Sequence, residues 1–238
     1  MSPTFSTADG NTVVLIHGWG GSAASTWNNN GWNRALSEQG CTPWAIDLPG
    51  HGTQPQPHDP EFYADLASRL QEKLPFEGPL DAIGFSLGAK VLLELAARHP
   101  HRFRRLVLGG LGGNVFTPEP LGQDLADALE TGVGANTPNA VRELVEYGVS
   151  HGNDPLALAA CLRRVPNPVL TPDRLAKVSC PTLLVVGKND RVAYPAQPLG
   201  EALPDADIRI LPNTAHLDLP ASATFQQLAA AHLGALAD

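Results

Sequence analysis

The pentapeptide Gly-Phe-Ser-Leu-Gly at positions 84–88 places Ser86 between an apolar run of strand length and a long helical stretch. A serine at so sharp a turn has a crowded backbone, and glycines two residues before and after it remove the Cβ atoms that would clash. The turn presents the hydroxyl to solvent at the positive end of a helix, where the backbone N–H of Leu87 has no intrahelical acceptor. These residues predict a nucleophilic serine with an oxyanion donor beside it.

Two glycine-rich loops upstream of Ser86 also follow apolar runs. The first, His-Gly-Trp-Gly-Gly, occupies 17–21, and the second, Ala-Ile-Asp-Leu-Pro-Gly-His-Gly, occupies 45–52. Together with the serine turn, these loops resemble those of the α/β-hydrolase superfamily, and the resemblance covers nearly the whole chain outside about 111–178. It implies the α/β-hydrolase fold, a second oxyanion donor at the Trp19 N–H, and catalysis without a cofactor.

The resemblance also implies a catalytic triad in the order nucleophile, acid, base. In this chain Asp190 and His216 each follow a strand-like segment. A serine hydroxyl is too weakly acidic to attack a carbonyl at neutral pH unless a base takes its proton, and histidine exchanges protons near that pH. We therefore expect Ser86 as nucleophile, His216 as base and Asp190 as the group that fixes the histidine tautomer. Asp218 is the next carboxylate to test.

Short apolar runs alternate with helical patterns along the chain, which is typical of a mostly parallel, doubly wound sheet with helices on both faces. Strands are predicted at 12–16, 42–46, 80–85, 105–109, 182–187 and 206–211. Helices are predicted from Asp59 to about Leu74, from Leu87 to Arg98, and after Pro220. Before the first of these strands there is room for at most one short edge strand, from Thr4 to Thr7.

Residues 111–178 interrupt this alternation and contain no convincing strand. Helices there are predicted at Thr137-Pro138, Asp154-Pro155 and Thr171-Pro172, where an N-cap residue precedes proline, and more weakly around Pro120 to Thr131. The family resemblance implies that such an insertion forms a cap over the nucleophile. We expect an α/β-hydrolase core of 1–110 and 179–238, a compact helical cap of 111–178, and a partly covered cleft.

The composition argues against some classes of binding partner and favours one cellular compartment. A chain of 238 residues with this fold is expected to form one domain, and its net charge of −8 would repel nucleic acid and anionic membranes. The odd number of cysteines, at 41, 161 and 180, favours thiols in a reducing compartment. The first residues lack the basic and apolar regions of a signal peptide, and no apolar run approaches the roughly 20 residues of a membrane span. We expect a cytoplasmic protein.

His17 and His51 lie beside glycines in the two upstream loops. We expect them to hold neighbouring backbone by hydrogen bonds, because a metal would need a third ligand at a fitting distance. No metal and no cofactor are predicted, and the oligomeric state stays open.

The loop at 17–20 is similar to that of the pimeloyl-acyl-carrier-protein methyl ester esterases, and this resemblance implies hydrolysis of a small to medium carboxylic ester. Candidate substrate contacts are Lys90, Phe116, Val192 and Leu217. We expect a neutral ester rather than one rich in carboxylates, because adjacent Arg163 and Arg164 point about 100° apart on a helix. At most one of them would face the cleft.

Three other functions stay open on the same fold. Lys90 stands four residues after Ser86, where the menaquinone-pathway synthases carry arginine, so a C–C eliminating synthase or lyase is one alternative. A cofactor-free haloperoxidase would share triad and fold with an esterase. A non-enzymatic ligand receptor is the third, although an intact triad favours an enzyme.

Overall fold

The computed structural model describes residues 11–74, 78–117, 122–165 and 170–234. The edge strand expected at 4–7 and the start of the helix expected near Pro120 lie outside these residues. The strands are β1 (Thr12–Ile16), β2 (Thr42–Ile46), β3 (Leu80–Phe85), β4 (Phe103–Gly109), β5 (Thr182–Gly187) and β6 (Ala206–Leu211). They form a six-stranded, all-parallel sheet in the order β2-β1-β3-β4-β5-β6. The prediction of a parallel α/β sheet is confirmed, and β4 begins at Phe103 rather than at residue 105.

Alternate residues of the central strands face opposite sides of the sheet, because side chains along a strand point up and down in turn. In β1, Val14 and Ile16 pack into the larger hydrophobic cluster, whereas Val13 and Leu15 pack into the second. All four are fully buried, as expected of parallel strands covered on both faces. The sheet is therefore the middle layer of the molecule.

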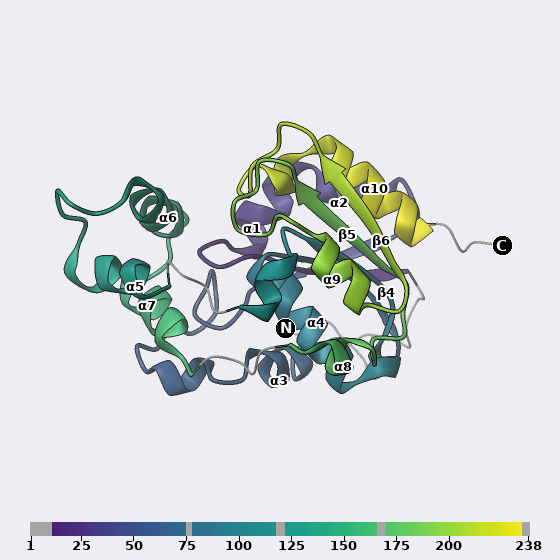
Figure 1. Cartoon of the computed structure of the whole chain (residues 1–238), viewed down its shortest axis with the longest axis horizontal. Coiled ribbons are helices and arrows are strands. Elements are labelled where there is room, and N and C mark those ends of the chain that lie inside the picture. The colour runs from purple at the N-terminus through teal and green to yellow at the C-terminus, as the bar shows by residue number, and fades with distance from the viewer. Residues whose placement is uncertain (1–10, 75–77, 118–121, 166–169, 235–238) are drawn as a thin grey trace.

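Helices lie on both faces of the sheet (Figure 1). They are α1 (Ala23–Thr26), α2 (Trp32–Ser37), α3 (Leu66–Gln71), α4 (Leu87–Arg98), α5 (Gly122–Thr131), α6 (Asn139–Ser150), α7 (Pro155–Arg163), α8 (Pro172–Leu175), α9 (Gln197–Ala202) and α10 (Ala223–Gly234). Residues of α3, α4, α8 and α9 belong to the larger cluster, whereas α2 and α10 pack into the second. The helix α4 is buried almost all round, as its apolar sequence predicts.

The single helix predicted from Asp59 onward is wrong, because the segment forms two shorter elements. Asp59 accepts a hydrogen bond from the Glu61 N–H and begins a 3₁₀ helix, Pro60–Tyr63. Asp65 then leaves helical geometry and caps α3 by accepting from the Ser68 N–H. A second N-cap residue inside an apolar pattern of helical spacing restarts the helix.

The helices α5, α6 and α7, called the cap helices below, lie together away from the sheet and share a hydrophobic cluster (Figure 1). α7 begins as predicted, since Asp154 accepts hydrogen bonds from two N–H groups of its first turn. The N-cap of α6 is Pro138 rather than Thr137. α8 is one turn long and packs on the main cluster through Leu175. The division into core and cap at 111 and 178 stays a prediction.

The three cysteines are buried thiols. Among the residues that the structure describes, no helix has both the length and the apolar character needed to cross a membrane.

The strand order reverses beside β1. From β1 the chain runs outward to β2 and then crosses to β3 on the other side of β1. In a parallel sheet covered on both faces, such a reversal opens a crevice for ligands at the carboxyl ends of the strands. Ile16 pairs with Gly84 in register, so the loop at 17–21 begins beside the turn that holds Ser86.

Gly88→Ala is expected to lower the free energy of unfolding by about 3 kcal/mol, because overpacking against backbone that cannot move is costly. A Cβ at Gly88 would lie 2.3 Å from the carbonyl oxygen of Ile16 and 2.5 Å from that of His17. Gly134→Ala is the matched control, since nothing lies within 4 Å of a Cβ built there. Chemical denaturation of both variants measures the difference, and equal stabilities would contradict it.

Candidate active site

Ser86 lies in a strained turn between β3 and α4. Its φ of 50° and ψ of −114° fall where residues other than glycine are rare. A Cβ at Gly84 would come within 2.6 Å of the Ala89 backbone nitrogen, so glycine is required there, as predicted. The Ser86 N–H donates to the Gly109 carbonyl oxygen at 2.8 Å. This bond to the end of β4 helps the sheet hold the strained residue in place.

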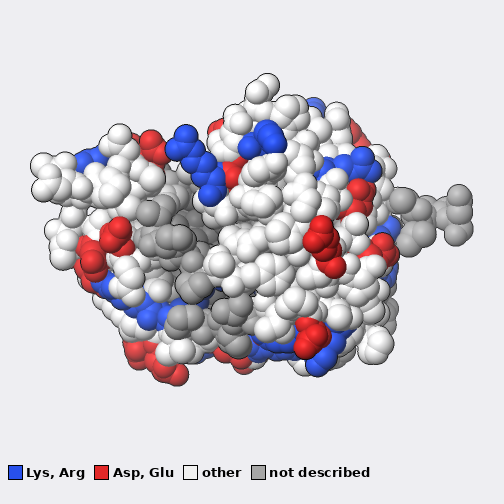
Figure 2. All heavy atoms as spheres, in the orientation of Figure 1, with Lys and Arg blue, Asp and Glu red and all other residues white. Residues whose placement is uncertain are grey.

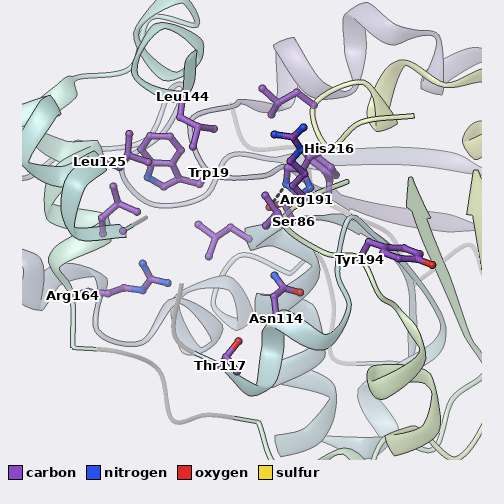
Figure 3. A pocket seen from close by; sticks show the side chains of 16 residues that line it. Trp19, Ser86, Asn114, Thr117, Leu125, Leu144, Arg164, Arg191, Tyr194 and His216 are labelled. Carbon is purple, nitrogen blue, oxygen red and sulfur yellow. Dashed lines mark hydrogen bonds between the residues drawn. The ribbon is translucent and has the colours of Figure 1, made fainter. Parts of the chain in front are cut away.

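Ser86, His216 and Asp190 form a continuous chain of hydrogen bonds. His216 Nε2 lies 2.9 Å from Ser86 Oγ, and His216 Nδ1 lies 2.8 Å from Asp190 Oδ2 (Figure 3). A carboxylate can only accept, so Nδ1 carries a proton and the neutral ring has Nε2 free to accept the hydroxyl proton. The structure therefore brings together the three residues that the sequence places far apart.

Asp190 is held rigidly behind His216. Its side chain is 1% exposed, and its Oδ1 accepts from the N–H groups of Val192 at 2.9 Å and Ala193 at 2.8 Å. Burial raises the pKa of Asp190, but the hydrogen bonds from His216 and from these two N–H groups outweigh it and lower the pKa below its usual value. The carboxylate is thus ionised and has one oxygen left for the histidine.

Trp19 and Leu87, the expected oxyanion donors, both border the same cavity as Ser86. Within the described part of the chain, neither backbone N–H has a backbone acceptor. The Trp19 indole Nε1 donates to the Leu158 carbonyl oxygen of α7 at 3.4 Å, which ties the first loop to the cap helices. Two residues that border the cavity thus keep a backbone N–H without a backbone acceptor.

The histidines of the upstream loops hold backbone, as predicted. The Leu48 N–H donates to His17 Nε2 at 3.0 Å, and His17 Nδ1 lies 2.7 Å from the Gly18 carbonyl oxygen. His51 Nδ1 lies 2.9 Å from the Pro49 carbonyl oxygen. Burial lowers the pKa of His17, which keeps the ring neutral and its Nε2 an acceptor. His17 therefore fastens the first loop to the second.

Asn153 is a positioning residue that sequence reasoning missed. It is 4% exposed, and its Nδ2 donates to the carbonyl oxygens of Gly20 at 2.7 Å and Gly148 at 3.1 Å. Its Oδ1 accepts from the Gly52 N–H at 2.9 Å. One amide thus joins both upstream loops to α6. A lone asparagine in a polar segment carries no motif that could have revealed this.

The cavity in front of Ser86 has a volume of about 410 Å³. It is lined by Trp19, Phe85, Ser86, Leu87, Asn114, Thr117, Gly122, Leu125, Leu144, Leu162, Arg164, Arg191, Val192, Tyr194, His216 and Leu217. Figure 2 shows a hollow between the cap helices and the body that carries the sheet, with lysine or arginine side chains at its upper rim. The site is a cleft between the two parts.

Two of the four candidate substrate contacts line this cavity, namely Val192 and Leu217. Lys90 is half-buried on α4 and Phe116 packs against the main cluster, and neither lines the cavity. Sequence reasoning gave no role to Asn114, Thr117, Arg191 or Tyr194, which do line it. The position of Arg191 directly after Asp190 was the one available signal.

A family model and the relatives found by sequence comparison agree on the family of this chain. The model of the alpha/beta hydrolase family matches residues 13–231. A pimeloyl-[acyl-carrier protein] methyl ester esterase of Neisseria meningitidis serogroup C is 35% identical over 141 residues, covering 57% of this chain and 50% of that protein. The chain thus spans about half the length of this relative. An esterase of the same name from Neisseria meningitidis serogroup B (strain H44/76) is 30% identical over 217 residues, covering 80% of this chain and 78% of the relative.

Among solved structures, the enol-lactonase from Burkholderia xenovorans LB400 has a TM-score of 0.74 at 20% identity. The match covers 95% of this chain and 92% of the lactonase. At this identity the likeness concerns the fold, and it fits the six-stranded parallel sheet with helices on both faces. The architecture is the α/β-hydrolase fold.

Asn153→Ala is expected to lower the free energy of unfolding by at least about 2 kcal/mol, because each buried backbone group left without a partner costs about 1–3 kcal/mol. Asn136→Ala, at an exposed position in the loop before α6, is the matched control and should change stability by no more than about 0.5 kcal/mol. Denaturant titration of both variants measures this. An Asn153→Ala protein as stable as the control would show that the amide does not join the loops to the cap.

Proposed function

Because the chain belongs to the alpha/beta hydrolase family, we propose that it is a serine hydrolase that cleaves small to medium carboxylic esters. The observation that carries the proposal is the unbroken hydrogen-bond chain from Ser86 through His216 to Asp190. The names of the two Neisseria relatives, both methyl ester esterases, support an ester as substrate.

In the proposed reaction, Ser86 Oγ attacks the ester carbonyl carbon while its proton passes to His216 Nε2. Asp190 accepts the Nδ1–H bond throughout and stabilises the imidazolium that forms. The carbonyl oxygen becomes an oxyanion, which the N–H groups of Leu87 and Trp19 receive, and each such donor is worth about 3 kcal/mol in other acyl-transfer sites. These groups are fixed before substrate binds, so little reorganisation accompanies the attack.

His216 then gives its proton to the departing alcohol, and an acyl-enzyme on Ser86 remains. A water molecule, deprotonated by the same imidazole, attacks the acyl carbon, and the acid is released as Ser86 regains its proton. Every proton in this sequence passes through His216 Nε2. Apart from the ester and the water molecule, each group named in these steps belongs to the chain.

The size and lining of the cavity support a small to medium ester. Its volume of about 410 Å³ lies in the range of small-molecule sites, roughly 300–1,000 Å³. Leu125, Leu144 and Leu162 of the cap helices contribute apolar walls. A hydrocarbon chain held by such walls gains about 0.8 kcal/mol for each buried CH₂ group.

Two of the three alternatives have less support. A C–C eliminating reaction of the menaquinone type was motivated by Lys90, which does not line the cavity. A ligand receptor has no need of an ionised Asp190 aligned through His216 on a serine hydroxyl, an arrangement that sets up proton transfer.

An organophosphonate probe is expected to label Ser86, as found by mass analysis of digested protein. Ser86→Ala should abolish labelling and reduce ester turnover by about 10⁴-fold or more, because the nucleophile is lost. Its free energy of unfolding should change by less than about 1 kcal/mol, since the neighbouring glycines accommodate the turn. Ser37→Ala, at an exposed site on α2, is the control. Labelling at another residue, or none, would refute the assignment.

Asp190→Asn is expected to lower kcat by about 10⁴-fold while substrate still binds. The N–H groups of Val192 and Ala193 keep the amide oxygen in the place of Oδ1, so the amide NH₂ faces His216 Nδ1. That nitrogen must then accept, the proton moves to Nε2, and the ring can no longer take the serine proton.

Asp218→Asn is the matched control, because exposed Asp218 accepts only a long hydrogen bond of 3.3 Å from the Ala215 N–H. Steady-state kinetics on p-nitrophenyl butyrate compare the two variants. If Asp190→Asn remained active and Asp218→Asn did not, the acid of the triad would be Asp218.

A further inference from the structure

The cavity carries positive charge in an acidic protein. Although the chain has a net charge of −8, the described residues that line the cavity include Arg164 and Arg191 and no aspartate or glutamate. A cleft with charges of one sign and low-dielectric walls concentrates the field on a bound molecule. It therefore favours an anionic group wherever a guanidinium faces the bound molecule.

Arg164 and its neighbour Arg163 differ in their surroundings. Arg163 forms ion pairs with Asp127 and Glu130, so its charge is neutralised by the protein. Arg164 has no carboxylate partner among the described residues. Its Nη1 donates to the Cys161 carbonyl oxygen, and its Nε is buried without an acceptor. Since a cation without a carboxylate partner is costly in a low-dielectric cleft, a ligand that brings a negative oxygen to the guanidinium stabilises this side chain.

Arg164 lies across the cavity from Ser86, and its guanidinium points into the space between them (Figure 3). Asn114 and Thr117 line the lower part of the cavity in the same view. Asn114 Oδ1 accepts from the Gly112 N–H at 2.9 Å, which leaves the amide nitrogen as a donor. The part of the cavity away from His216 is thus equipped with donors.

The two ends of an ester have different paths in this cavity. In the proposed reaction the alcohol receives its proton from His216, and Val192 and Leu217, which also line the cavity, are 41% and 39% exposed. The side of the cavity at these two residues is called the mouth below. An alcohol protonated by His216 would have this exposed side as its way out. The acyl chain would then extend in the other direction from Ser86, toward Arg164.

We propose that the esters preferred by this site are monoesters of dicarboxylic acids, whose one free carboxylate, at the far end of the acyl chain, is bound by Arg164. This inference rests on the proposed ester hydrolysis. Water adds across the ester bond, so the products are a dicarboxylate and an alcohol. One inward guanidinium matches one carboxylate, whereas two or three would leave buried anions unpaired. The proposal thus differs from the neutral ester expected from the sequence by one carboxylate.

The test compares kcat/KM for the monomethyl esters of glutarate, adipate, pimelate and suberate with the methyl esters of straight-chain monocarboxylic acids of equal carbon number. The ratio of the two values at each chain length is the readout. In the unmodified protein we expect the anionic ester to be preferred by at least about tenfold at the one or two lengths that span the cavity. A preference for the neutral ester at every length would overturn the proposal.

Three variants identify the residue responsible. Arg164→Gln should bring the ratio to about one, and Arg164→Lys should restore part of it, since a lysine pairs with a carboxylate less specifically. Arg209→Gln removes the same charge from an exposed position on β6 and should keep the ratio of the unmodified protein. If Arg191→Gln rather than Arg164→Gln removed the preference, the anion would bind at the mouth, and the proposal would be wrong.

A second test uses the unmodified protein and does not depend on the variants. Adipate should protect Ser86 from the organophosphonate at a concentration at least about tenfold lower than hexanoate does, and equal protection would contradict the proposal. If the unmodified protein hydrolysed none of the esters and Ser86 was not labelled, the proposed function itself would be refuted. Turnover and labelling without a preference for the anionic ester would refute the inference about Arg164 alone.

Discussion

The close approach of α4 to β1 at Gly88 is the constraint on which the site depends. The carbonyl oxygens at the end of β1 occupy the space that any side chain at position 88 would need. This approach brings the start of α4, with the Leu87 N–H, beside the loop that carries Trp19. The two N–H groups of the proposed oxyanion site thus come from a helix end and a neighbouring loop, and Ser86 between them holds an unfavourable φ of 50°.

Buried polar groups hold the loops to one another and to the rigid sheet. His17 fastens the first loop to the second, Asn153 fastens both loops to α6, and the Asp190 carboxylate is fixed by two N–H groups of its own loop. Each of these side chains is nearly or fully buried, so the loss of a hydrogen-bond partner would destabilise the folded protein. These bonds restrict the motion of the loops, and the proposed oxyanion stabilisation would depend on that, because donors must be in place before charge develops.

Sequence patterns predicted the elements whose physics is local. Parallel strands buried on both faces appear as continuous apolar runs, and the turn at Ser86 has steric demands that only glycine meets. Sequence patterns could not predict the role of a side chain where that role depends on residues distant in the sequence. Val141 and Leu144 have the same helical spacing, yet Val141 is buried inside the cap cluster and Leu144 lines the cavity. Adjacent arginines are equally ambiguous, because only the positions of Asp127 and Glu130 show which arginine is neutralised.

The helix α7 carries or adjoins residues that hold the upstream loops and the arginine proposed to bind substrate. Asn153, just before its first turn, holds the upstream loops, and Leu158 in its middle accepts the Trp19 indole N–H. Arg164 is the C-cap at its other end. The proposed anion contact at Arg164 and the residues that hold the loop of Trp19 therefore belong to one helix and the residue just before it. If Arg164 binds the distal carboxylate as proposed, the binding energy acts on the same helix that accepts the Trp19 indole N–H. Interactions far from the reacting bond can in this way contribute to the rate as well as to binding.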